Sequence, residues 1–255
     1  MLDQPSMSQE QGIATNIARV RERIAAAAVR GGREIDEITL VAVSKTKPLE
    51  LVKLAYQAGI RDFGENRVQE ALDKMADFSP SDLRWHLVGH LQTNKAKKVY
   101  ASFAYIHSVD SLHVAQALQH VAERDSTDGE QGTDGQRTLR MRQPILLQVN
   151  IADEASKEGM RAEEAPAIAR QIAALPHLEI QGLMTVAPLV ADIEQVRPVF
   201  RALRELRDSL RQQLPDCNWR HLSMGMTNDY PVAIEEGATI VRIGRAIFGE
   251  RIAVS

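Results

Sequence analysis

Strand-like and helix-like segments alternate along this chain, and no other feature restricts its fold as strongly. Eight short apolar runs, rich in β-branched residues, each precede a segment with helical periodicity. The predicted strands span residues 38–44, 60–63, 85–89, 104–108, 144–150, 178–184, 220–223 and 239–243. The helices predicted after them span 48–58, 66–77, 93–101, 111–124, 163–174, 193–213, 229–236 and 245–249. An amphipathic helix near residues 10–30 precedes the first strand.

Eight strand–helix units in 255 residues have the size and order of a (β/α)8 TIM barrel. We expect a single domain, residues 1–255, with an additional N-terminal helix. The rival is a doubly wound open sheet, which usually has fewer units and a glycine-rich first turn. The first turn here, Ser44–Pro48, contains no glycine. Residues 125–142 lack apolar periodicity, so we predict a flexible surface loop between the fourth helix and the fifth strand.

Composition and charge argue against several classes of protein. The formal net charge of -3 gives no electrostatic signature of nucleic-acid binding. No run of 18 apolar residues exists, and the polar start lacks the pattern of a signal peptide, so we expect a cytoplasmic protein without membrane contact. The single cysteine, Cys217, excludes an internal disulfide and a cysteine-cluster metal site.

Lys45 stands at the end of the first predicted strand. Side chains alternate along a strand, so Lys45 shares a face with Val41 and Val43 and leaves a packed interior at its rim. Partial desolvation lowers the pKa of such an amine and suits it to Schiff-base chemistry. The alternative is a lysine that extends from a strand end into water, and the strand by itself favours that interpretation.

Polar or small residues follow nearly every predicted strand. In a barrel of this kind, chemistry takes place where the strands end. The residues there include Lys45, Asn66, Gly89, His90, Asp110, Asn150, Met184, Thr185, Ser223, Thr227, Arg242 and Gly244. Their convergence suits a small polar ligand. His90 by itself fits an ordinary loop histidine, and Asn150 and Asp110 could equally cap helices or turns.

The last two strand ends carry the most specific pattern. Leu222–Asp229 has a glycine between hydroxyl groups, and Val241–Gly249 has an arginine and a glycine before a helical turn. Backbone N–H groups at helix starts, with nearby hydroxyls, bind anions, and barrel enzymes often hold phosphate after strands seven and eight. Two tight turns that need glycine are the alternative. A Schiff-base lysine opposite a phosphate pocket describes a site for pyridoxal 5′-phosphate (PLP).

Six sequence blocks carry a resemblance to a known family. They are Val41–Pro48, Phe63–Glu70, His86–Lys95, Gly182–Thr185, Leu222–Asp229 and Val241–Gly249. In this order they resemble the pyridoxal phosphate homeostasis proteins (the YggS/PROSC family), which share the barrel of the alanine racemase N-terminal domain. The resemblance covers most of the chain, from about Ile38 to Gly249.

The resemblance implies a role for each matching residue. Lys45 forms the aldimine with PLP, and Lys47 is the less favoured attachment point. Arg242 faces the pyridine nitrogen. The groups implied around the phosphate are Ser223, Thr227, Gly244 and Arg245. The residues implied beside the ring are Asn66 and Met184.

The resemblance also implies a protein that binds PLP without an established enzymatic activity and acts in PLP and amino-acid homeostasis. We expect a monomer, with PLP-dependent apo-enzymes as candidate recipients of the cofactor. An arginine is always a donor, so it leaves the ring nitrogen unprotonated and the electron sink weak.

Three other functions stay open. One is a PLP-dependent amino-acid racemase-like enzyme, for which a second base is needed. Alanine racemase takes a tyrosine from a second domain, we expect no such domain here, and Tyr230 is the nearest of the four tyrosines to the phosphate loop. The second is a lysine aldolase. The third is a protein-interaction role, for which the sequence offers no partner motif.

Overall fold

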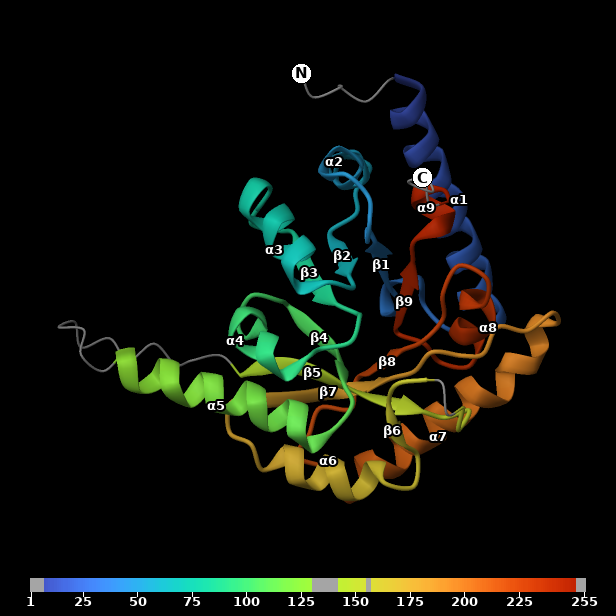
Figure 1. The fold of residues 1–255 in the computed structure, drawn as a ribbon. Helices are drawn as coiled ribbons and strands as arrows, with labels where there is room; N and C mark the ends of the chain where they lie inside the picture. Colours follow the sequence, from blue (N-terminus) through green and yellow to red (C-terminus); the bar gives the residue numbers. More distant parts are fainter. Residues whose placement is uncertain (1–6, 130–141, 155–156, 251–255) are drawn as a thin grey trace.

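Eight parallel strands close into a barrel surrounded by helices (Figure 1). The computed structural model describes residues 7–129, 142–154 and 157–250. Around the barrel the strands follow the order β1, β2, β3, β4, β5, β7, β8 and β9, and β9 pairs with β1 to close it. The predicted TIM barrel is therefore confirmed.

All eight predicted strands are present, with ends that differ from the predicted ends by a few residues. They are β1 Thr39–Val43, β2 Asp62–Glu65, β3 Arg84–Leu87, β4 Tyr105–Val109, β5 Gln143–Asn150, β7 Leu178–Met184, β8 His221–Ser223 and β9 Ile240–Ile243. A two-residue strand, β6 (Met160–Arg161), pairs with β5 outside the barrel. The sequence did not predict β6, which is too short for a periodic pattern.

The helices also follow the predicted order. They are α1 Met7–Arg30, α2 Leu49–Gln57, α3 Val68–Asp77, α4 Ala96–Val99, α5 Leu112–Gly129, α6 Ala165–Ala173, α7 Arg197–Gln213, α8 Tyr230–Glu235 and α9 Arg245–Phe248. Short 3-10 helices occupy Ile35–Glu37, Thr93–Lys95 and Ile193–Val196.

One boundary was wrong. Helix α5 continues to Gly129, so residues 125–129 are helical where a loop was predicted. Each added helical residue gains a backbone hydrogen bond whatever its polarity, and the first glycine after the apolar stripe is where the helix stops. The rest of the predicted loop, residues 130–141, lies outside the described residues.

Helix α1 is the predicted additional helix before the barrel. Its buried residues Ile13, Ile17, Val20, Ile24, Ala27 and Ala28 recur at helical spacing and form one apolar stripe. The stripe packs beside α8 and α9, and the Asn16 side chain donates a hydrogen bond to the Ile247 carbonyl at 3.1 Å (Figure 1). Over the described part of the chain, no helix combines the length and apolarity that crossing a bilayer requires.

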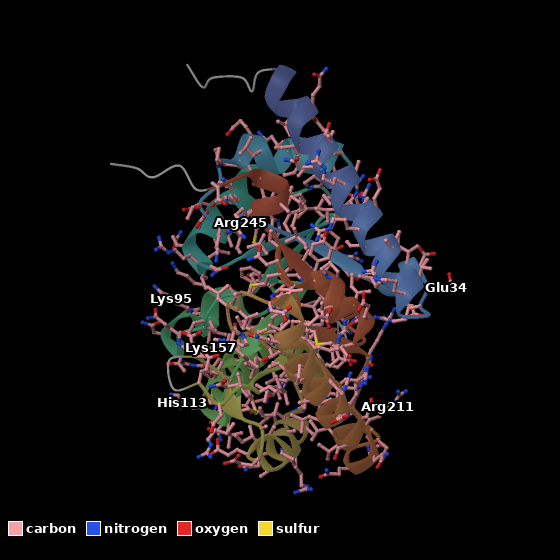
Figure 2. All side chains as sticks on the ribbon, turned by 90° about the vertical axis from the view of Figure 1, so that its right-hand side faces the viewer. Glu34, Lys95, His113, Lys157, Arg211 and Arg245 are labelled. Carbon is pink, nitrogen blue, oxygen red and sulfur yellow. The ribbon has the colours of Figure 1, made fainter. Side chains whose placement is uncertain are left out.

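The parallel strands give the barrel two different ends. Figure 2 shows Lys95, Lys157 and Arg245, which follow β3, β5 and β9, on one side of the molecule. Glu34 and Arg211, which precede β1 and β8, lie on the opposite side. The loops that follow the strands therefore lie at the same end of the barrel, where barrels of this kind form their sites.

The side chains inside the barrel form two sets from interleaved strands, called here the apolar half and the polar half. Val41, Leu146, Met184 and Ile240 form the apolar half, a small, fully enclosed cluster. Polar residues from β2, β3, β4, β8 and β9 form the polar half. They are Asp62, His86, His107, His221, Ser223 and Arg242, all buried.

Candidate functional site

A cavity of about 900 Å³ opens at the carboxyl ends of the strands. Seven of the eight residues implied by the family resemblance line it: Lys45, Asn66, Met184, Thr227, Arg242, Gly244 and Arg245. They come from loops that are far apart in the sequence but adjacent in the barrel. The structure therefore brings seven of the eight predicted residues together at one cavity.

The two lysines after β1, Lys45 and Lys47, both line the cavity. The Lys47 amine donates hydrogen bonds to three backbone carbonyls, those of Phe248 (3.1 Å), Gly249 (3.2 Å) and Glu250 (2.8 Å). Its charge thus sits at the carboxyl end of α9, where a cation is stabilised. Lys47 is therefore held against the backbone at the carboxyl end of α9.

The turn that carries Lys45 is strained. Thr46 has a φ of 62°, a left-handed conformation that β-branched residues rarely adopt. Such a conformation costs roughly 1–3 kcal/mol and persists only where the surroundings hold it. Here the Thr46 N–H donates to the Glu70 carboxylate at 2.6 Å. The hydrogen bond from Thr46 to Glu70 of α3 therefore helps to hold the strained turn in place.

A buried charged cluster lies beneath this turn. The Lys74 amine contacts Glu65 at 2.7 Å and Glu70 at 2.9 Å, and it donates to the Ser44 carbonyl at 2.8 Å. The Ser44 hydroxyl also donates to Glu65 at 2.6 Å. Burial raises the pKa of Glu65, while the hydrogen bond from Lys74 opposes that rise. The cluster holds the residues on both sides of Lys45 and so fixes the position of its backbone.

Arg242 is a buried cation that reaches the cavity wall. Its guanidinium donates to the Ser223 hydroxyl at 2.6 Å and to the Thr185 carbonyl at 2.8 Å. Burial lowers the pKa of Arg242 to about 10, so the group stays charged at neutral pH. Within the described residues no carboxylate lies at ion-pair distance from it. Arg242 therefore keeps donor capacity for a ligand.

Ser223 lies behind Arg242 and not in the cavity wall. Its hydroxyl is fully buried and contacts both Arg242 and the His107 ring. The proposed contact of Ser223 with phosphate stays a prediction, whereas its hydrogen bond to Arg242 is a feature of this structure.

Another part of the cavity wall carries groups of the kind that bind anions. Thr227, Gly244 and Arg245 line it together with Asn228, and the Arg245 guanidinium donates to the Asn228 side chain at 2.5 Å. Gly225 makes the turn before them, with a φ of 94°, and a Cβ there would lie 2.7 Å from the Ala233 Cβ. The loops after β8 and β9 thus bring together the Thr227 hydroxyl, the Gly244 backbone amide and the Arg245 guanidinium.

Sequence reasoning missed several cavity residues, among them Gln148, Glu158, Val186 and Asp229. Gln148 lies two residues after Leu146 in β5 and so shares its face, which the period-two pattern of a strand predicts. Glu158 lies in the irregular segment between β5 and β6, and no local signal marks it.

The structure gives the positions of three further residues that the sequence analysis considered: His90, Asn150 and Tyr230. His90 lines the cavity, with its ring nitrogen 3.4 Å from the Asp110 carboxylate. Asn150 donates to the Glu154 carbonyl at 2.9 Å and holds a loop. Tyr230 is fully buried, and no tyrosine of the described residues lines the cavity. No group of three potential metal-binding side chains occurs in those residues either.

Comparison with known proteins agrees with this geometry. The family model described as alanine racemase, N-terminal domain, matches residues 11–252. The pyridoxal phosphate homeostasis protein of Pseudomonas aeruginosa is 43% identical over 239 residues, which cover 94% of this chain and 96% of that protein. The structure of PipY from Synechococcus elongatus with PLP bound is 36% identical, with a TM-score of 0.77, over 93% of this chain and 100% of that chain.

A more distant relative shares only the fold. Alanine racemase from Clostridium difficile, in complex with cycloserine, is 13% identical with a TM-score of 0.70, over 97% of this chain and 61% of that chain. The chain therefore belongs to the alanine racemase N-terminal domain family and, within it, to the pyridoxal phosphate homeostasis proteins.

Proposed function

We propose that this protein binds PLP in the cavity and acts in PLP homeostasis as a cytoplasmic carrier without catalytic turnover. One observation carries the proposal: a single cavity joins Lys45, the charged donor Arg242 and the oxyanion groups around Thr227. PipY, a relative of similar length, has been seen with PLP bound. PLP-dependent apo-enzymes are the recipients we propose.

The chemistry of PLP fits these groups. Its aldehyde carbon condenses with the Lys45 amine, which releases water and forms a Schiff base. Thr227, Gly244 and Arg245 bind the phosphate, and Arg242 donates to the ring nitrogen. Asn66 and Met184 lie beside the ring.

The same groups explain why we propose a carrier without catalytic turnover. PLP, when bound, supplies a conjugated ring that withdraws electrons, most strongly when its nitrogen is protonated. Arg242 holds a proton that it does not give up, so it leaves that nitrogen unprotonated. Tyr230, the nearest tyrosine to the phosphate loop, is enclosed in protein and does not reach the cavity.

Attachment to Lys45 is tested by borohydride reduction of the PLP-bound protein and peptide mapping. We expect the pyridoxyl group on Lys45, and Lys45→Ala should lose the visible absorption band of bound PLP. The matched control is Lys47→Ala, which should keep the band because Lys47 is held by three carbonyls. Label recovered mainly on Lys47 would overturn the assignment.

Recognition of phosphate is tested by comparing PLP with pyridoxal. A charge-assisted hydrogen bond contributes roughly 1.5–3 kcal/mol, so PLP should bind at least tenfold more tightly. Thr227→Ala and Arg245→Ala should each reduce that preference. Equal affinity for the two compounds would mean that the loops after β8 and β9 are only structural turns.

A racemase-like activity is the second candidate, because His90 and Glu158 also line the cavity and lie 3.6 Å apart. Either could act as a base opposite Lys45. Incubation with single-enantiomer amino acids in deuterated water measures it directly. Stereospecific turnover at about 1 per second or more would replace the carrier proposal.

A further inference from the structure

A chain of hydrogen bonds runs through the barrel interior beneath Arg242. From the cavity it passes to Ser223 (2.6 Å), then to His107 Nδ1 (2.9 Å), from His107 Nε2 to His86 Nδ1 (2.9 Å), and from His86 Nε2 to Asp62 (2.9 Å). All of these side chains are buried. The chain starts on β9 at the cavity and ends at the first residue of β2, near the other end of the barrel.

The direction of the hydrogen bonds is argued from the Asp62 end of the chain. An ionised Asp62 only accepts, so His86 Nε2 carries the proton and, in a neutral ring, His86 Nδ1 accepts. His107 Nε2 must then donate and its Nδ1 must accept, which leaves the Ser223 hydroxyl as its donor. Ser223 therefore accepts from Arg242, a group that only donates. The donation from Arg242 is compatible with this direction, since a hydroxyl can accept one hydrogen bond while it donates another.

The surroundings favour these protonation states. Burial by itself would raise the pKa of Asp62, but hydrogen bonds from His86 and Arg84 hold it below its ordinary value. The Arg84 guanidinium makes two hydrogen bonds of 2.7 Å to that carboxylate. Burial lowers the pKa of His107 well below its ordinary value, so its ring is neutral at pH 7.

The chain bears on how a buried arginine can stay charged and still donate to a ligand. A buried cation without a compensating charge is costly, yet a carboxylate placed directly on Arg242 would occupy the donors that a ligand needs. Here the carboxylate whose charge stabilises protonated Arg242 is the buried Asp229, which lines the cavity and makes no ion pair with it. Asp62 is itself paired with Arg84 and reaches Arg242 only through three intervening side chains. The aligned dipoles of His86, His107 and Ser223 point their negative ends toward the guanidinium, and its outward N–H groups stay available.

We infer that Asp62, His86, His107 and Ser223 are positioning residues for Arg242: they hold its guanidinium as a charged donor directed into the cavity. The inference rests on the proposed PLP function, because the ring nitrogen is the acceptor that this donor would meet. It gives Ser223 a role in the site through Arg242.

The direction of the chain is tested on the protein without PLP. Nitrogen-15 NMR of the histidine side chains at pH 7 should show a neutral His107 ring with its proton on Nε2. A proton on His107 Nδ1 would overturn the inferred direction. This measurement does not depend on cofactor binding.

The link to the site is tested with His107→Phe, with His221→Phe as the matched control. His221 is another buried ring of the barrel interior, but its contacts are Tyr105 and Thr239 and not the chain. His107→Phe should weaken PLP binding at least tenfold and expose the Arg242 N–H groups to faster hydrogen exchange. His221→Phe should change PLP affinity less than twofold. Equal effects of the two substitutions would refute the positioning role.

Ser223→Ala provides a smaller change if His107→Phe does not fold. It removes one oxygen, breaks the chain next to Arg242 and should also speed hydrogen exchange at Arg242. Unchanged exchange and unchanged PLP affinity in this variant would refute the inference. If the unmodified protein bound no PLP, the proposed function would fail along with the link to the site, and the NMR spectra would still decide the direction of the chain.

Discussion

The two halves of the barrel interior differ in what they contribute. The apolar half, with Val41, Leu146, Met184 and Ile240, resembles the branched apolar filling that is usual in such barrels. The polar half, with His107 and its neighbours, replaces that filling by hydrogen bonds. Each hydrogen bond adds only about 0.5–1.5 kcal/mol net, but it fixes direction. Stability and orientation of the site are thus supplied by different sets of side chains in the same interior.

The largest effect should come from the apolar half. Leu146 is fully buried, so Leu146→Ala should lower the free energy of unfolding by about 3–5 kcal/mol through lost burial and a cavity. Urea unfolding measures this loss. Leu189→Ala is the control, since Leu189 is 89% exposed, and it should cost less than about 0.5 kcal/mol. A loss below about 1 kcal/mol for Leu146→Ala would contradict the assigned packing role.

The polar half should respond to pH. Burial, followed by the charge of Arg220, lowers the pKa of His221 from 6.5 to about 4. Because the folded-state pKa is the lower one, the unfolded chain takes up a proton first as the pH falls below 6.5. Stability is therefore complete above 6.5 and is lost toward pH 4, with His221 contributing roughly 2.5 kcal/mol between pH 7.5 and 4.5.

Urea unfolding at the two pH values checks this prediction. His221→Phe should lose less stability on acidification than the unmodified protein. The pKa of Asp62 lies below 3.8, so Asp62 stays ionised at both pH values and does not affect the difference between the two proteins. The same pH dependence in both proteins would show that His221 does not titrate as described.

The smallest effect should come from Met184, where the apolar half meets the cavity. Met184→Leu nearly conserves volume, so the free energy of unfolding should fall by less than about 1.5 kcal/mol. PLP affinity, measured by absorbance titration, should change less than about threefold for the same reason. A loss of PLP affinity far beyond that would show that the sulfur itself, and not its bulk, matters at the ring.

The sequence predicted the barrel and part of the cavity lining because both depend on local patterns. Period-two alternation identified the strands, and the residue after each strand faces the site. Ser223 shows the limit of that rule. Its alternation with Leu222 predicts an inward side chain, but only the pairing of β8 with β9 decides that Arg242 takes its hydroxyl. Glu158 and the charged cluster around Lys74 depend likewise on contacts between segments, which no single segment encodes.

The pairing of β1 with β9 determines when the site can exist during synthesis. Lys47 and its acceptor Phe248 are 201 positions apart, and at roughly 5–20 residues per second that distance takes about 10–40 s to translate. Throughout that interval the part of the cavity formed by β9 and the loop after it has not yet been synthesised. Capture of PLP should therefore report barrel closure: in refolding with PLP present, its absorption band should appear only in the last phase, with the final strand in place.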